Sequence, residues 1–192
     1  MFMFDVETMD TESTAVILSL AIVQFEPSEK PTYQELLDKT LFIKLDAKEQ
    51  IKVFKRSINK DTIEWWAKQH EYARSISVTP SANDVSSLEA VETLKRYINM
   101  YPNGSTQAFW ARGALDSMAI DSLCRNLDID PITSYYNWRD VRTAIDLLYG
   151  TTNGYCDVDH PEFNRDLVIK HHPSHDVCLD VMMLLYGKEG VK

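Results

Sequence analysis

The sequence has few cysteines and no long apolar run. Its 192 residues include three cysteines, Cys124, Cys156 and Cys178, and no Cys-x-x-Cys pair. This odd number and wide spacing argue against a disulfide framework or a structural zinc cluster and indicate a reducing compartment. The longest strongly apolar stretch, residues 15–23, is too short to cross a membrane. The first residues carry two acids and no basic leader. We therefore expect a cytoplasmic protein with no membrane partner.

Positive charge is also in short supply, since 20 Lys and Arg stand against 29 Asp and Glu, for a net charge of −9. Affinity for nucleic acid comes largely from neutralising phosphates, so this balance counts against a protein that wraps DNA or RNA. It counts less against an enzyme that grips only a strand end and whose acids hold divalent cations, because each ion adds +2 locally. Length and composition otherwise favour one ordinary globular domain spanning residues 1–192.

The most informative stretch is the first predicted strand, residues 1–8. Its apolar residues run directly into Asp5 and Glu7, which alternate with Val6 and therefore point to the same side of a strand. We expect their Cα atoms roughly 6.6 Å apart, at about 3.3 Å of rise per residue. Unpaired like charges resist burial, and a cation between the two carboxylates would resolve that conflict. The alternative is a strand that ends in a solvated acidic turn.

Periodicity predicts an α/β protein that opens with an antiparallel meander of three strands, over residues 1–8, 15–25 and 39–45. Two further short strands are expected over residues 107–111 and 133–137. Asp61 is expected to cap a helix that holds Trp65 and Trp66, with Glu64 completing a capping box. The other predicted helices cover residues 88–100, 114–127, 138–149 and 173–186, and long loops cover residues 75–87 and 151–170.

Three more residues stand out by position. Asp116 opens a predicted helix directly after a strand, and Asp180 lies inside the otherwise apolar C-terminal helix, where a charge needs a partner. His175 precedes Asp180 by five residues and titrates near neutrality, so it could take a proton from water. Carboxylate oxygens are the ligands that Mg²⁺ and Mn²⁺ prefer, so these acids and those of the first strand are candidate metal ligands.

These residues carry a resemblance to a known family. Phe4-Asp5-Val6-Glu7-Thr8, Trp110-x-Arg-Gly-x-Leu-Asp116 and His175-x-x-x-x-Asp180 resemble the three exonuclease motifs of the DEDD superfamily, in its histidine-bearing (DEDDh) branch. Residues 15–25, 110–116 and 138–143 are similar to the bacteriophage exonuclease A group in particular. The resemblance covers nearly the whole chain and implies a ribonuclease H-like mixed sheet flanked by helices. It also implies 3′→5′ exonuclease activity, in the host cytoplasm if the chain is phage-encoded.

The resemblance assigns a role to each motif residue. It implies that two divalent ions, Mg²⁺ or Mn²⁺, are held by Asp5, Glu7, Asp116 and Asp180. His175 would deprotonate the attacking water, and nucleoside monophosphates would leave the 3′ end of single-stranded DNA. Asp121 is a rival for Asp116, and Asp176 is a lesser rival for Asp180.

Candidate substrate contacts lie in or near the motifs and are Thr8, Trp110, Arg112, Arg139 and Arg142. Arg165 and Lys170 are further candidates for phosphate contacts. The basic stretch over residues 48–60 is either a lip for a phosphate backbone or a solvated face. One of the two adjacent tryptophans could stack on a base, although partial burial is the simpler expectation.

Other interpretations stay open. A zinc site of His171, His172, His175 and Cys178 is disfavoured because Pro173 interrupts a shared helical face. The substrate could be RNA, as in oligoribonuclease-like and RNase T-like relatives, some of which are homodimers, since no residue identifies itself as the reader of the 2′-OH. A catalytically silent nucleic-acid-binding module of the same fold is the third interpretation. Such a module would have no physical reason to keep mutually repelling carboxylates.

Overall fold

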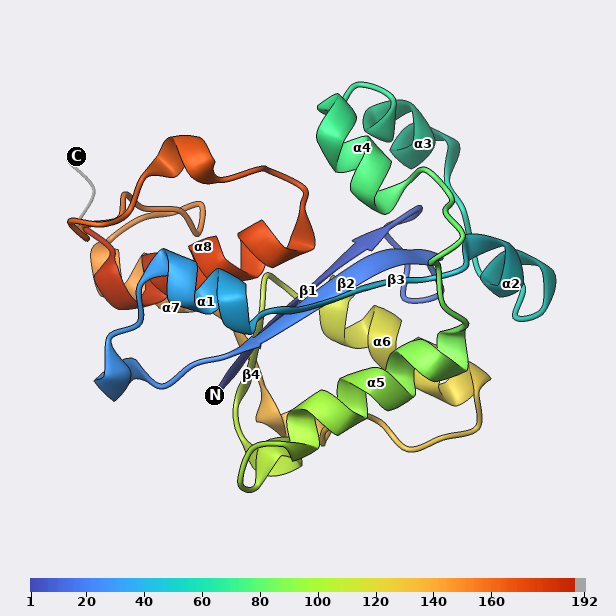
Figure 1. The fold of residues 1–192 in the computed structure, drawn as a ribbon, viewed down its shortest axis with the longest axis horizontal. Helices are drawn as coiled ribbons and strands as arrows, with labels where there is room; N and C mark the ends of the chain where they lie inside the picture. Colours follow the sequence, from blue (N-terminus) through green and yellow to red (C-terminus); the bar gives the residue numbers. More distant parts are fainter. Residues whose placement is uncertain (189–192) are drawn as a thin grey trace.

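The first strand lies at the centre of the fold. In a computed structural model, which describes residues 1–188, five strands form one sheet in the order β3-β2-β1-β4-β5 (Figure 1). The strands are β1 (Phe2–Thr8), β2 (Ile17–Gln24), β3 (Leu41–Lys44), β4 (Phe109–Ala111) and β5 (Trp138–Asp140). The first three pair antiparallel, whereas β4 and β5 pair parallel to their neighbours. The predicted α/β class, with an antiparallel opening meander and parallel strands, is confirmed.

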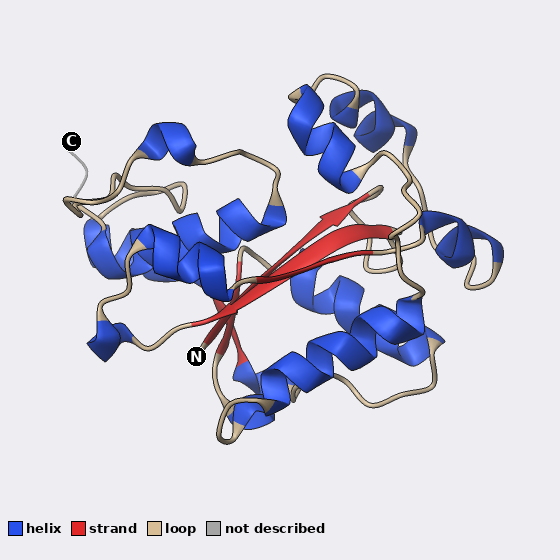
Figure 2. Cartoon of the chain, in the orientation of Figure 1, coloured by secondary structure: helices blue, strands red, loops and turns tan. Residues whose placement is uncertain are grey.

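Helices cover both faces of the sheet, as Figure 2 shows. They are α1 (Tyr33–Lys39), α2 (Ala47–Lys52), α3 (Lys60–Trp66), α4 (Glu71–Ser77), α5 (Ser87–Asn99), α6 (Leu115–Asn126), α7 (Val141–Tyr149) and α8 (Pro173–Tyr186). Along β1, Phe2, Phe4 and Val6 enter the core shared with α5 and α6. Met3 points the other way, into the core shared with α1, α7 and α8. This alternation gives the odd-numbered residues of β1 to the α8 face.

Several predicted boundaries are wrong for local reasons. The predicted strand over residues 133–137 is instead a 3₁₀ turn, Tyr135–Asn137, and the strand is β5 (Trp138–Asp140). Helix α7 therefore begins at Val141, after Asp140 accepts a hydrogen bond from Thr143 N. Residues 138–140 were expected to be helical, but they pair with β4, and this tertiary pairing overrides their helical pattern.

The expected cap at Asp61 is also wrong. Asn59 caps α3, with its side chain accepting a hydrogen bond from Asp61 N. The sequence pattern missed α1, and part of the expected loop over residues 75–87 belongs to α4. Within residues 1–188, no helix is long and apolar enough to cross a membrane.

A buried arginine ties α6 to the turn after β1. Arg56 is only 4% exposed, and its side chain has no carboxylate partner among residues 1–188. Its guanidinium instead donates to the carbonyl oxygens and side chains of Ser13, Ala15, Ala119, Ser122 and Asn126. Because α6 begins with Leu115 and Asp116, this network helps to fix the helix that carries one of the predicted acids.

We predict that Arg56→Ala lowers the free energy of unfolding by about 3 kcal/mol or more, because it leaves several buried acceptors unpaired. Urea unfolding of the two proteins measures the difference. The control is Arg125→Ala, which removes an exposed arginine from α6, the helix that Arg56 contacts, and should change stability by less than about 0.5 kcal/mol. Equal stability of Arg56→Ala and the wild type would contradict the structural role of this network.

Candidate active site

The two acids of β1 lie where the strand departs from regular pairing. Asp5 and Glu7 share the face of Met3 and therefore point toward α8. The register with β2 shifts between Glu7, opposite Ser19, and Thr8, opposite Ile17. The extra residue, Leu18, belongs to β2, and such bulges are common next to active sites. The sequence predicted the shared face of the two acids but contained no sign of the bulge.

Asp116 reaches the same place because β4 is short. Strand β4 pairs with β1 only at Phe2 and Met3, so the later edge of β1 is open. There, Val6 N donates a hydrogen bond to Asp116 Oδ1 at 3.3 Å. The first turn of α6 thus takes the position that β4 leaves at the carboxyl end of the parallel strands, where α/β proteins commonly bind ligands.

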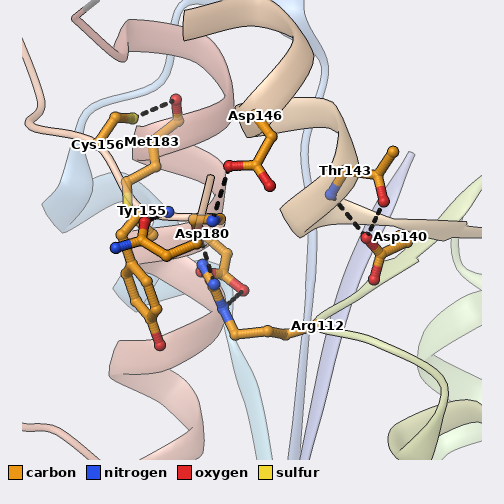
Figure 3. A network of polar contacts seen from close by, with 10 residues as sticks. Arg112, Asp140, Thr143, Asp146, Tyr155, Cys156, Asp180 and Met183 are labelled. Carbon is orange, nitrogen blue, oxygen red and sulfur yellow. Dashed lines mark hydrogen bonds and ion pairs between the residues drawn. The ribbon is translucent and has the colours of Figure 1, made fainter. Parts of the chain in front are cut away.

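Asp180 and Asp176 come from the other side of the site. They lie one turn apart on α8 and so share a face of the helix. Asp180 is only 7% exposed and accepts hydrogen bonds from Arg112, whose Nε lies 3.1 Å from both carboxylate oxygens. Figure 3 shows Arg112 reaching from the end of β4 to this carboxylate, with Tyr155 beside it. The Arg112 Cζ lies 4.1 Å from the centroid of the Tyr155 ring.

A turn of the long loop holds Arg112 in place. Arg112 Nη1 donates to the Gly154 carbonyl oxygen at 2.8 Å, and Gly154 N donates to an oxygen of Asp146 at 2.8 Å. Gly154 has a positive φ of +72°, and a Cβ there would lie 2.6 Å from the Cβ of Arg142. Only glycine fits this turn without displacing its neighbours. The loop expected over residues 151–170 therefore contributes ordered contacts to the site through Gly154.

Burial and mutual repulsion shift the pKa values of the acids upward. Burial, and then the charge of Asp180, raise the pKa of Asp5 to about 7. The pKa values of Glu7, Asp116 and Asp176 are also raised, mainly by burial and then by Asp5. One oxygen of Asp5, Oδ2, is buried and has no hydrogen-bond partner among residues 1–188. These carboxylates offer many oxygen ligands and have too few cationic partners to balance their charge. Such a group fits divalent cations such as Mg²⁺ or Mn²⁺.

Four of the acids, Asp5, Glu7, Asp176 and Asp180, line a cavity of about 530 Å³ that also holds basic side chains, whereas Asp116 lies outside this lining. The lining residues that carry charge or can ligate are Asp5, Glu7, Arg112, Arg142, Arg165, Lys170, His171, Asp176 and Asp180. Four basic residues of this acidic chain thus share the cavity lining with four acids. Tyr155 belongs to the same lining, and no sequence pattern pointed to it.

The structure places His171 and His175 in different surroundings at the start of α8. His175 lies in the first turn of α8, and its Nδ1 is 2.7 Å from the Tyr33 hydroxyl on α1. Burial lowers the pKa of His175. It is His171, before the helix, that has a ring nitrogen near the acids, within 4.8 Å of ligand oxygens of Glu7 and Asp176. His171 and Asp176 are five residues apart, as are His175 and Asp180. This shared spacing is the sequence feature that could have pointed to His171 and Asp176.

Other predicted residues lie outside the cavity lining. The Thr8 hydroxyl donates to the Asp10 carbonyl, and Trp110 Nε1 lies 3.4 Å from Met1 Sδ. Arg139 donates to backbone carbonyls of its own turn. Asp121, the rival of Asp116, lies on α6, and one of its oxygens is buried without a partner among residues 1–188. These positions favour Arg112 and Arg142 among the candidate substrate contacts.

Within residues 1–188, the four residues of the disfavoured zinc site do not form one group of ligand atoms, although the rings of His172 and His175 lie 4.9 Å apart. His171 lies by Glu7 and Asp176, His175 contacts Tyr33, and Cys178 Sγ lies 3.4 Å from the Thr40 hydroxyl. Of the adjacent tryptophans, Trp66 is buried and donates to the Thr8 carbonyl, whereas Trp65 is 40% exposed.

Comparison with known proteins places this geometry in context. Residues 1–184 match the family described as the 3′-5′ exoribonuclease Rv2179c-like domain. The chain is also 29% identical, over 205 aligned residues, to an exodeoxyribonuclease of Enterobacteria phage T4. That alignment covers 97% of this chain and 88% of the phage protein.

We predict that Asp5→Asn stabilises the metal-free protein at pH 8 by about 3 kcal/mol. With a folded pKa of about 7 and an ordinary value of 3.8, Asp5 binds its proton more tightly in the native state than in the unfolded state. This carboxyl therefore makes stability fall as pH rises from about 4 to 7, and the asparagine variant lacks that contribution. Urea unfolding in EDTA at pH 5 and pH 8 measures the difference in free energy of unfolding between the variant and the wild type. This gap should be wider at pH 8 than at pH 5. A gap that shrinks at pH 8 would contradict the buried, repelling cluster.

We also predict that Arg112→Gln, in EDTA at pH 8, costs about 3 kcal/mol of stability, because Asp180 loses its buried counter-ion. The double variant Arg112→Gln/Asp180→Asn should recover most of this loss. Arg142→Gln is the matched control, since no ion pair or hydrogen bond of its guanidinium to an acid is found within residues 1–188. A loss of equal size in both single variants would show that Arg112 acts only through general charge.

Proposed function

Because the chain belongs to the family of Rv2179c-like 3′-5′ exoribonuclease domains, we propose that it removes nucleoside monophosphates from the 3′ end of single-stranded DNA. The family and the phage relative make the chain a 3′-5′ exonuclease, a hydrolase of phosphodiester bonds. The choice of DNA rests on the relative named an exodeoxyribonuclease. The word exoribonuclease in the family description favours RNA as a second candidate substrate.

One observation supports this proposal most directly. The predicted acids come from β1, α6 and α8, and they meet in one cluster in which Asp5 raises the pKa values of Glu7 and Asp116, and Asp180 raises the pKa values of Asp5 and Asp116. We propose that two divalent ions are held there by Asp5, Glu7, Asp116 and Asp180. Bound there, such ions would lower the pKa of an attacking water and stabilise the charge of the leaving oxygen.

The chain's own residues would position the substrate and move the proton. Arg112, Arg142, Arg165 and Lys170 line the cavity and supply donors for phosphate oxygens. In our proposal His175 is the general base. With Tyr33 engaging its Nδ1, the proton from water would go to Nε2. This role requires His175 to turn toward the acids when substrate binds, as a residue at the start of a helix can do.

The homodimer that the resemblance allows stays a prediction. Sedimentation of the purified chain, with and without a short oligonucleotide, measures the oligomeric state directly. The result does not bear on the assignment of the acids, since all of them come from one chain.

The function is tested with 5′-labelled single-stranded DNA and RNA of equal sequence, in Mg²⁺ or Mn²⁺ and in EDTA. We expect a metal-dependent ladder that shortens from the 3′ end, with the faster ladder naming the preferred sugar. Asp116→Asn should lower the rate on the order of 100-fold or more, whereas Asp121→Asn should stay within about 2-fold. His175→Ala should lower it about 10²–10⁴-fold.

Each result excludes an alternative. Equal loss in the Asp116 and Asp121 variants would overturn the assignment of the second motif. Full activity of His175→Ala, with loss in His171→Ala, would move the base to the earlier histidine. Binding of the strand without cleavage would favour the silent module.

A further inference from the structure

Tyr155 presents an open aromatic ring to the cavity. The residue is 46% exposed, and its hydroxyl forms no hydrogen bond within residues 1–188, where only its backbone N–H donates one. Apart from Leu179, every other residue of the lining is an acid, a base or an imidazole. A flat apolar face among so many charges is a surface on which a nucleobase can stack.

The backbone on either side of Tyr155 is fixed. Gly154 N donates to an oxygen of Asp146, and the Gly154 carbonyl accepts from Arg112 Nη1, each at 2.8 Å. On the other side, Cys156 is buried, and its Sγ lies 3.6 Å from a backbone carbonyl oxygen of α8. The ring therefore extends from an ordered turn, as Figure 3 shows.

Arg112 covers one face of the ring. Its Cζ lies 4.1 Å from the ring centroid, close enough for a cation–π contact. The guanidinium is itself held by Asp180, since Arg112 Nε lies 3.1 Å from both carboxylate oxygens. Figure 3 shows the ring alongside this guanidinium, with the hydroxyl directed away from Asp180. Because Arg112 occupies one face, the opposite face is the one that a ligand in the cavity can reach.

The rest of the cavity suits the polar part of a nucleotide. Its volume of about 530 Å³ falls within the range of roughly 300–1,000 Å³ that is usual for small-ligand sites. Basic side chains of the lining, and the cations proposed above, would hold a phosphodiester. The base of the same nucleotide then needs an apolar surface. Base–aromatic stacking supplies one for any sequence, because every base has a π-face.

We propose that the 3′-terminal base of the substrate stacks on Tyr155, with Arg112 supporting the ring from behind. This inference rests on the proposed function and deepens it, because it names a residue that positions the terminal nucleotide. A stack of this kind holds the bound substrate and its transition state alike, so Tyr155 sets KM and leaves kcat nearly unchanged. It also gives little discrimination among the four bases.

The test combines changes in the protein with changes in the substrate. Two 5′-labelled oligonucleotides of the preferred sugar end either in an adenine nucleotide or in an abasic nucleotide, and release of the last residue in Mg²⁺ is measured. For the wild type, we expect the abasic end to raise KM about 10-fold or more, within the range for one base–aromatic stack. Tyr155→Ala should raise KM for the adenine end by a similar factor, with kcat within about 2-fold, and should no longer distinguish the two ends.

Three further variants and substrates act as controls. Tyr155→Phe keeps the ring and should stay within about 2-fold of the wild type. Tyr155→Leu keeps an apolar side chain without the flat ring, so it should lose most of the preference, and it replaces Tyr155→Ala if that variant folds poorly. Tyr135→Ala removes a tyrosine that is 84% exposed and lies outside the cavity lining, and it should keep the wild-type preference. An abasic residue five nucleotides from the 3′ end should have the same effect in the wild type and in Tyr155→Ala.

The outcomes separate this inference from the proposed function. A wild type that shortens both strands with equal KM overturns the stack and leaves the exonuclease in place. A Tyr155→Ala protein that keeps the full preference for the adenine end does the same. An equal fall in kcat for both ends in Tyr155→Ala would also overturn the stack, since it would show that Tyr155 acts only through Arg112. Failure of the wild type to shorten any strand overturns the proposed function, and the stack with it.

Discussion

The repulsion among buried carboxylates is the constraint on which the rest of the site depends. Asp5, Glu7 and Asp116 lie in surroundings that oppose their ionisation, and their pKa values rise accordingly. A protein of ordinary stability holds only about 5–15 kcal/mol of folding free energy, so such a group must be secured by strong packing elsewhere. The sheet supplies that packing. Phe2, Phe4 and the other apolar residues of the central strands are fully buried on both faces.

Each element contributes to the site for a reason visible in its packing. Strand β1 is central and paired on both sides at its start, which fixes the carboxylates at its end. Strand β4 stops early, and so α6 can place Asp116 at the open edge of β1. Helix α8 lies across the same face and adds Asp180, with Arg112 as its counter-ion. Removal of Arg112 would leave Asp180 without the counter-ion that it has in the described part of the chain.

The sequence predicted the parts of the site that depend on local periodicity. Alternation along a strand placed Asp5 and Glu7 on one face, and a charge inside an apolar helix singled out Asp180. Spacing could not place the histidines, because their orientation depends on where the helix begins. Helix α8 starts at Pro173, so His175 is already helical, and successive helical residues point about 100° apart. His175 therefore turns to Tyr33 while Asp176 faces the acids. The pairing of Trp138–Asp140 with β4 is a tertiary effect that no local pattern contained.

The distribution of charge explains how a chain with a net charge of −9 can act on a polyanion. The average charge opposes the approach of nucleic acid, but the cavity lining combines acids on β1 and α8 with Arg142, Arg165 and Lys170. Without cations, the acids would repel a phosphate and the basic residues alone would attract it. If cations neutralise the acids, as we propose, the bound ions and the basic residues of the lining would attract the same phosphate. Metal binding and substrate binding are then coupled by simple electrostatics, and the affinity for a strand end should depend on the ion more than on the length of the strand.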